Sequence, residues 1–251
     1  MESIVCIPFN NEALNFAAKH LSRCGITTTS LPHNDVTHLL LPVPSFDDSG
    51  HIRGGGSIEG LLRQFSESIC VIGGNLSHIA LRPYKTIDLL QDPHYVTQNA
   101  AITAYCALKY IINALPVVIA QQTILIIGWG RIGKCLSKLL RDMNAHVTIL
   151  ARKETDRAMA TALGYHVCDA DVDLSHFRVL INTAPASIFN ADQLCKCRSD
   201  CYKLDLASIQ GIPGPGVLWA RGLPGKDAPE SSGILIADTI MRLSIYKEVA
   251  P

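Results

Sequence analysis

The sequence predicts an α/β protein: a Rossmann-type doubly wound parallel sheet with a second, smaller α/β domain. First, strand-like and helix-like patterns alternate along most of the 251 residues. Second, a glycine turn at 128–133 (GWGRIG) lies between an apolar strand pattern and a helical pattern, the βαβ context of a dinucleotide site. Third, hydrophobic residues make up 48% of the chain and charged residues 18%, so it can bury one large or two modest cores.

The N-terminal domain is expected to span residues 1–98 and to lie on the substrate side. A helical spacing of apolar residues runs from Asn11 to Cys24, and Gly25 follows as a C′ glycine. The Gly- and Asp-rich segment 47–57 predicts a surface loop. Short apolar runs predict strands at 3–7, 26–31, 37–43 and 68–72.

The dinucleotide-binding domain is expected at residues 99–228. A linker helix at 99–115, closed by Pro116, enters it. The tail at 229–251 has apolar residues at helical spacing, which predicts a C-terminal helix that packs back on the N-terminal domain. The strands expected between linker and tail are 123–127, 147–150, 179–182, 202–206 and 217–220.

Each glycine of the turn has a physical role in a dinucleotide site. Gly128 permits the tight turn, Gly130 lets the backbone approach a pyrophosphate, and Gly133 lets helix and strand pack closely. The diphosphate would lie on the free N–H groups at the helix start. A glycine turn without a ligand is the alternative, and the surrounding βαβ pattern favours the coenzyme.

Coenzyme choice is set at the end of the second strand of this fold, where an acidic residue commonly binds the ribose 2′-OH of NAD. Arg152 and Lys153 occupy that place here. A guanidinium can bind a 2′-phosphate through paired, charge-assisted hydrogen bonds, so NADP is favoured over NAD. Glu154 follows closely enough to reach a 2′-OH, which leaves NAD open, and a solvated pair of cations is the alternative without a function.

Further coenzyme contacts are expected where later strands end, because ligands of open α/β sheets lie beyond the carboxyl ends of the strands. The segments 183–185 and 206–208 follow two such strands, although helix caps and turns explain the same residue types equally well. The predicted coenzyme-binding residues are Gly128, Trp129, Gly130, Arg131, Ile132, Gly133, Arg152, Lys153, Thr183, Ala184, Pro185, Leu206, Ala207 and Ser208.

Composition and charge argue against several classes of function. The formal net charge is +0, which favours neither nucleic acid nor an anionic membrane surface as a partner. No apolar run reaches the roughly 18 residues of a membrane span, and the N-terminus lacks the basic region of a signal peptide. Nine cysteines, most of them in apolar runs, indicate reduced thiols and a cytoplasmic protein. Cys195, Cys197 and Cys201 lack the second pair that common zinc sites use, so no metal is expected.

Several motifs in order resemble one known family, the A subunits of dipicolinate synthase from spore-forming bacteria. The resemblance covers about residue 37 to the end of the chain. It implies a two-domain dehydrogenase-like fold, use of NADP, a role in sporulation, and oxidation of dihydrodipicolinate to dipicolinate with a flavoprotein B subunit. The matching pieces are 41–44 (LPVP), Asn99, 103–104 (TA), 128–133 (GWGRIG), 151–153 (ARK), Gly164, 181–183 (INT), Pro185, 205–208 (DLAS), 222–225 (GLPG) and 228–229 (AP).

The chain departs from that family at two motifs. Tyr105 stands where the family has a Glu, and 231–233 (SSG) replaces a Thr-Ala-Gly. Two-domain hydroxy-acid dehydrogenases use a His late in the coenzyme domain as acid and base, whereas the last His here is His176. Ordinary 2-hydroxy-acid chemistry is therefore not expected, and Tyr105, Asp205 and Ser208 are the candidate catalytic residues.

A small-molecule dicarboxylate is the expected substrate, and N–H donors or cations are needed to bind it. The predicted substrate contacts are Gly74, Asn75, Thr103, Pro224 and Gly225. Another NAD(P)-dependent imino-, amino- or hydroxy-acid dehydrogenase is one alternative, and a non-catalytic NADP-binding protein that serves a partner is a second. A homo-oligomer, with the dimer as the expected form, completes the predictions.

Overall fold

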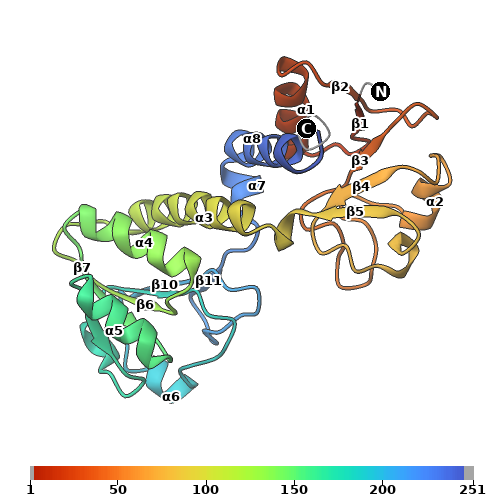
Figure 1. Cartoon of the computed structure of the whole chain (residues 1–251). Helices are drawn as coiled ribbons and strands as arrows, with labels where there is room; N and C mark the ends of the chain where they lie inside the picture. Colours follow the sequence, from red (N-terminus) through yellow and green to blue (C-terminus); the bar gives the residue numbers. More distant parts are fainter. Residues whose placement is uncertain (1–2, 246–251) are drawn as a thin grey trace. The chain divides into compact units, whose positions relative to one another are not determined.

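The computed structural model describes residues 3–245, and these residues divide into two compact units (Figure 1). Unit 1 comprises Met1–Asn99 and Pro224–Pro251, and unit 2 comprises Ala100–Leu223. Each unit holds its own parallel sheet, so the predicted α/β fold class with two domains is confirmed. The predictions for residues 1–2 and for 246–251, the end of the expected tail helix, lie outside the described residues.

Unit 1 contains a five-stranded parallel sheet in the order β2-β1-β3-β4-β5. Its strands are β1 (Ile4–Cys6), β2 (Thr27–Thr29), β3 (His38–Leu40), β4 (Cys70–Gly73) and β5 (Lys85–Asp88). The sequence did not predict β5, because its first two residues are exposed and its apolar pattern is weak. The helices are α1 (Glu12–Arg23), α2 (Ile58–Leu62), α8 (Pro229–Ile240) and the short turns η1 (Ile79–Leu81), η2 (Leu89–Gln91) and η4 (Met241–Ile245).

Helix α8 packs against α1 within unit 1. Ile236, Ala237 and Ile240 are buried in one apolar cluster with Leu14 and Leu21 of α1. The two helices approach closely at Gly233, where a Cβ would lie 2.8 Å from the backbone nitrogen of Ala17. The chain therefore returns to unit 1 after it has built unit 2, and the apolar tail helix supplies part of the first core.

Unit 2 contains a six-stranded parallel sheet in the order β11-β10-β9-β6-β7-β8. Numbered from β6, this is the 3-2-1-4-5-6 order of a doubly wound dinucleotide-binding fold. The strands are β6 (Thr123–Ile127), β7 (His146–Leu150), β8 (His166–Cys168), β9 (Val179–Asn182), β10 (Tyr202–Asp205) and β11 (Val217–Trp219). The helices are α4 (Arg131–Asp142), α5 (Glu154–Ala162), α6 (Ala191–Leu194) and the turn η3 (Leu174–His176).

Two helices span the boundaries between the units. Helix α3 (Pro93–Ala114) begins six residues before the expected linker helix, because Asp92 caps it: the carboxylate accepts a hydrogen bond from the Tyr95 N–H at 2.8 Å. Pro93 fits the first helical position, where its missing N–H costs nothing. The second helix is α7 (Leu223–Asp227). Within residues 3–245, none of the helices is both long and apolar enough for a membrane span.

Candidate coenzyme site

The glycine turn follows β6 at the topological switch point of unit 2, between β6 and β9. Gly128 has φ of 99°, in the left-handed region that glycine adopts freely, and a Cβ there would lie 2.7 Å from Thr183 Oγ1. A Cβ at Gly133 would collide with the carbonyl oxygen of Gly128. Helix α4 can therefore pack this closely against the turn only because residue 133 is glycine.

Gly130 leaves open space at the start of α4. It is extended, with φ of −78° and ψ of −171°, and a Cβ there would meet no heavy atom within 4 Å. It is also the N-cap of α4 and supplies no side-chain hydrogen bond to the first turn. The N–H groups of the first helical turn therefore have no capping side chain, and an anion can approach them.

The loop after β9 is fixed to the glycine turn and to its own strand. The Thr183 hydroxyl donates to the carbonyl oxygen of Ile127 at 3.0 Å. The buried Asn182 amide donates to Ala184 O at 2.9 Å and accepts from Ala184 N at 3.1 Å. These bonds hold residues 183–186 in one conformation beside the turn, which suits a preformed ligand site.

Asp205 ends β10 and is fully buried. Its Oδ1 accepts hydrogen bonds from Asn182 Nδ2 at 3.0 Å and Ala207 N at 2.9 Å. Its Oδ2 accepts from Gly211 N at 2.7 Å and Ile212 N at 2.8 Å. The carboxylate therefore fixes the loop after β10 and the side chain of Asn182, a structural role that competes with the predicted role of a general base.

A cavity of about 580 Å³ lies along these strand ends. This volume is in the range of small-molecule sites, roughly 300–1,000 Å³. Its lining comes from the loops after β6, β7 and β9 and from the first turn of α5. The lining residues are Ile127, Gly128, Trp129, Gly130, Leu150, Ala151, Arg152, Lys153, Asp156, Thr183, Ala184, Pro185, Ala186 and Ile188.

The cavity brings together most of the predicted coenzyme-binding segments. Gly128–Gly130, Arg152–Lys153 and Thr183–Pro185 all line it. Arg131, Ile132 and Gly133 belong to α4 behind the turn and do not line it. Leu206, Ala207 and Ser208 do not line it either, because the hydrogen bonds of Asp205 fold that loop onto its own strand end.

Two cations and one acid meet where β7 ends. Arg152 and Lys153 are exposed side chains at the cavity, and Asp156 of α5 joins them. The sequence pattern pointed to Glu154, which is exposed and does not line the cavity, and it gave no sign of Asp156. Arg157 holds this loop from behind, with Nη1 donating to the carbonyl oxygens of Ala151 and Arg152, both at 3.2 Å.

Trp129 is the large side chain of the glycine turn and is 5% exposed. Its ring contacts the Tyr165 ring edge to face at 5.3 Å, and the Arg141 guanidinium lies 4.3 Å from the centre of the Tyr165 ring. Trp129 Nε1 is buried without a hydrogen-bond partner within the described residues. The indole thus supports one wall of the cavity by packing against neighbouring elements.

The other catalytic candidates lie on exposed segments of unit 2. Tyr105 is 62% exposed on α3, and Ser208 is exposed in the loop after β10. Neither lines the coenzyme cavity. No side chain of the described residues is thereby singled out as the general base.

The predicted substrate contacts fall in both units. Gly74 and Asn75 follow β4, and Gly74 is a packing glycine, since a Cβ there would lie 2.9 Å from both Leu90 Cδ1 and Val43 Cγ1. The Asn75 N–H donates to Asp88 at 3.0 Å, so this N–H already has an acceptor. Thr103 is buried in α3, while Pro224 and Gly225 belong to α7.

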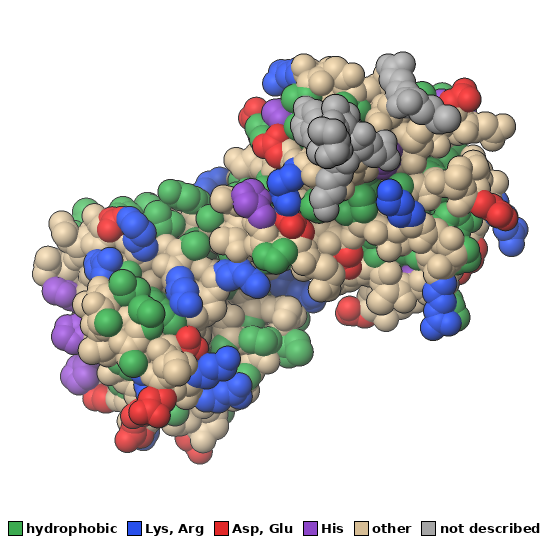
Figure 2. Space-filling view, viewed as in Figure 1, with side chains coloured by type: hydrophobic (Ala, Val, Ile, Leu, Met, Phe, Trp, Pro, Cys, Tyr) green, Lys and Arg blue, Asp and Glu red, His purple; other side chains and the backbone are tan. Residues whose placement is uncertain are grey.

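Charges of both signs share the surface. On the face drawn in Figure 2, Lys and Arg side chains lie among Asp and Glu side chains on both units. This distribution matches the formal net charge of +0. Among the described residues, no group of three or more His, Cys, Asp or Glu side chains is placed to hold a metal ion, and Cys195, Cys197 and Cys201 form no such group.

Comparison with known proteins defines the class of unit 2. Residues 111–206 match the family model for the NAD binding domain of D-isomer specific 2-hydroxyacid dehydrogenases. The strand order, the glycine turn and the cavity at the switch point agree with that match. Unit 2 is therefore a nicotinamide-coenzyme-binding domain of the dehydrogenase type.

The similarity to the A subunits of dipicolinate synthase is confirmed over most of the chain. The A subunit from Bacillus subtilis (strain 168) is 24% identical, in an alignment that covers 88% of this chain and 81% of that protein. The crystal structure of the A subunit from Bacillus halodurans superposes with a TM-score of 0.80 at 21% identity, covering 96% of this chain and 97% of that one. The crystal structure of the Bacillus subtilis protein gives a TM-score of 0.79 at 20% identity, covering 99% and 97%. These structural likenesses show the shared fold.

Proposed function

We propose that this protein is an NADP-dependent oxidoreductase that oxidises dihydrodipicolinate to dipicolinate together with a flavoprotein B subunit. The observation that supports the substrate and the partner is the 24% identity with the A subunit of dipicolinate synthase over 88% of the chain. The observation that supports the coenzyme is the open glycine turn beside two cations at one cavity.

The chemistry needs few protein groups. Oxidation removes a hydride from one ring carbon and a proton from the ring, and the product is an aromatic pyridine, so aromatisation drives the reaction forward. A nicotinamide coenzyme held at the glycine turn would supply the hydride acceptor. The protein has to hold the ring and the coenzyme in reacting geometry, exclude water and accept one proton.

The choice of NADP rests on the end of β7. A 2′-phosphate there would meet Arg152 and Lys153, and the guanidinium can donate two parallel hydrogen bonds to it. Asp156 opposes a phosphate and favours a ribose hydroxyl, so the balance of the three charges is one net positive charge. We propose that NADP binds more tightly than NAD and that the margin is modest.

One assay tests the proposed reaction. Purified protein is supplied with dihydrodipicolinate and NADP⁺, and the absorbance of reduced coenzyme is followed together with the pyridine product, with and without a flavoprotein partner. Equal yields of reduced coenzyme and dipicolinate support the proposal. If a preparation that binds the coenzyme forms neither product with or without the partner, the proposed reaction is refuted.

A non-catalytic coenzyme-binding role is the second candidate. It is favoured by Asp205, whose carboxylate oxygens already accept four hydrogen bonds, and by Tyr105 in place of the acidic residue of the family. In that case the protein alone binds NADP without turnover, and turnover requires the partner protein. Single-turnover kinetics with the isolated chain separates the two functions.

A further inference from the structure

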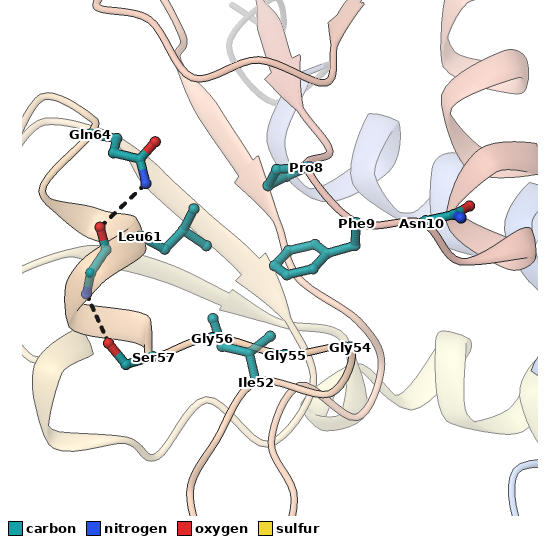
Figure 3. Close-up of a pocket in the computed structure, with 11 residues that line it drawn as sticks. Pro8, Phe9, Asn10, Ile52, Gly54, Gly55, Gly56, Ser57, Leu61 and Gln64 are labelled. Atoms are coloured by element: carbon teal, nitrogen blue, oxygen red, sulfur yellow. Dashed lines mark hydrogen bonds between the residues drawn. The ribbon is translucent and has the colours of Figure 1, made fainter.

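A second cavity lies wholly within unit 1, next to the loops that follow β1 and β3 (Figure 3). Its volume is about 380 Å³, in the lower part of the range of small-molecule sites. Nothing in the proposed reaction uses it. It is lined by Pro8, Phe9, Asn10, Ile52, Gly54, Gly55, Gly56, Ser57, Gly60, Leu61 and Gln64.

The position of this cavity follows from the sheet topology. In the order β2-β1-β3-β4-β5, β2 lies on one side of β1 and β3 lies on the other. The direction in which strands are added therefore reverses at β1, and the switch point of this sheet lies between β1 and β3. Open parallel sheets bind ligands at that point, beyond the carboxyl ends of the strands. Residues 8–10 follow β1 and residues 52–57 follow β3, so the cavity opens where the fold favours a ligand.

The walls of the cavity combine apolar side chains with the bare backbone of a glycine run. Figure 3 shows the Phe9 ring and the Leu61 side chain facing each other across the space beside the glycine run. Ile52 closes the base and is 3% exposed. The run Gly54–Gly56 has φ of 105°, 106° and 89°, so this backbone is built for glycine and presents no side chain. A Cβ at Gly55 or Gly56 would meet nothing within 4 Å, and one at Gly54 would lie 3.8 Å from the Phe9 ring.

The polar groups of the lining are all uncharged. Gln64 Nε2 donates to Gly60 O at 3.3 Å, which fixes the amide at the rim and leaves Oε1 as an acceptor (Figure 3). Ser57 Oγ accepts from Gly60 N at 3.1 Å. Arg53 belongs to the same loop, but its Nε donates to Phe46 O at 2.9 Å and it does not line the cavity. A carboxylate in this cavity would therefore lack a cationic side chain to pair with.

We propose that this cavity binds a small, uncharged, planar ring that bears a carboxamide-type donor and acceptor. The ring would stack on Phe9 and contact Leu61, and the amide would hydrogen-bond with Gln64 and the exposed backbone of the glycine run. The lining holds no cationic side chain to pair with the doubly charged substrate of the proposed reaction, and this site goes beyond that function and does not depend on it.

The test uses two probes of equal shape and different charge, benzamide and benzoate. Binding to the full chain is measured by ligand-observed NMR and calorimetry, with and without NADPH. Benzamide is expected to bind saturably with a Kd in the millimolar range. Benzoate should bind at least about tenfold more weakly, because the lining offers its carboxylate no cationic partner. Binding of benzamide should be independent of NADPH.

Three variants locate the probe. Phe9→Ala is expected to weaken benzamide about fivefold or more through loss of the stacked ring, and Gln64→Leu about threefold. Phe16→Ala is the matched control, because Phe16 is equally half-buried in unit 1 but lies outside the lining. Gln64 is exposed, so its variant keeps the test valid should Phe9→Ala fail to fold.

Each contrary result overturns the proposal. Absence of saturable binding removes the site, and equal binding of benzoate removes the charge selection. Unchanged binding in both Phe9→Ala and Gln64→Leu places the probe elsewhere. Displacement by dipicolinate assigns the cavity to a charged substrate instead, whereas the proposed reaction would then stand.

Discussion

Removal of the two cations at the end of β7 should change coenzyme choice without changing the fold. Arg152 and Lys153 are exposed and line the cavity. The double variant Arg152→Ala/Lys153→Ala removes both positive charges without changing a buried position. A hydrogen bond to a charged group contributes about 1.5–3 kcal/mol. Because solvent screens these exposed pairs, the lower half of that range applies to the two side chains together, which corresponds to a Kd about 12- to 40-fold weaker.

The measurement is the Kd of NADPH and of NADH by calorimetry, for wild type and variant. NADPH should weaken by that factor while NADH stays within about twofold, because NADH has no 2′-phosphate to pair. Added salt should reduce the wild-type preference as well, since the pairs are exposed. Lys196→Ala, which removes an exposed cation outside the cavity, serves as the control. Equal weakening of both coenzymes, or a wild type that prefers NADH, would refute the reasoning.

Three further predictions follow from contacts within the units. Asp156→Asn removes the acid beside the two cations, so NADPH should tighten by about threefold relative to NADH, and an unchanged ratio would place Asp156 outside the site. Asp205→Asn turns one acceptor oxygen into an N–H donor that faces buried N–H groups. The free energy of unfolding, measured by urea titration, should therefore fall by about 3 kcal/mol. Intact stability with lost turnover would instead make Asp205 the base. Burial acts to raise the pKa of Asp92, but the hydrogen bonds from Arg242 and from the Tyr95 N–H outweigh it and lower the pKa. Because the folded pKa lies below the unfolded value near 3.9, the ion pair stabilises the fold above that pH and loses its effect as pH falls through the folded pKa. Arg242→Ala should therefore cost about 0.5–1 kcal/mol at pH 5–8 and progressively less in more acidic solution. A loss that is constant with pH would contradict this.

The sequence predicted the coenzyme-binding half best where strands are fully buried. β6 and β9 are continuous apolar runs buried on both faces, so their pattern is unambiguous, and the loops that follow them reach the cavity as expected. β8 has three residues, with His166 exposed and the next two half-buried, so a short edge strand of this kind leaves no periodic pattern to detect.

Several features of the site depend on contacts that a sequence does not display. Asp205 stays a candidate base because it ends a strand, but the sequence does not show that its carboxylate also binds N–H groups six and seven residues later. Asp156 escapes prediction because its place on the cavity depends on where α5 begins, and helix starts are poorly defined by pattern alone. The linker helix begins earlier than its apolar pattern indicates, because an Asp before a proline is also an N-cap that starts a helix.

The central claim is that a dinucleotide pyrophosphate lies against the backbone of the glycine turn, and Gly130→Val tests it most directly. Gly130 has ordinary extended backbone angles and open space beyond its Cα, so the valine should fit without a clash and fill the place of the ligand, at a cost of about 1 kcal/mol for a less favourable N-cap residue. Ala158→Val, the same kind of enlargement at an exposed position of α5, is the control. Calorimetry should show NADPH binding in wild type and control and at least about a hundredfold loss in Gly130→Val, whose melting temperature should fall by only a few degrees. Undiminished binding in that variant, or no binding of either nicotinamide coenzyme to wild type, would contradict the account.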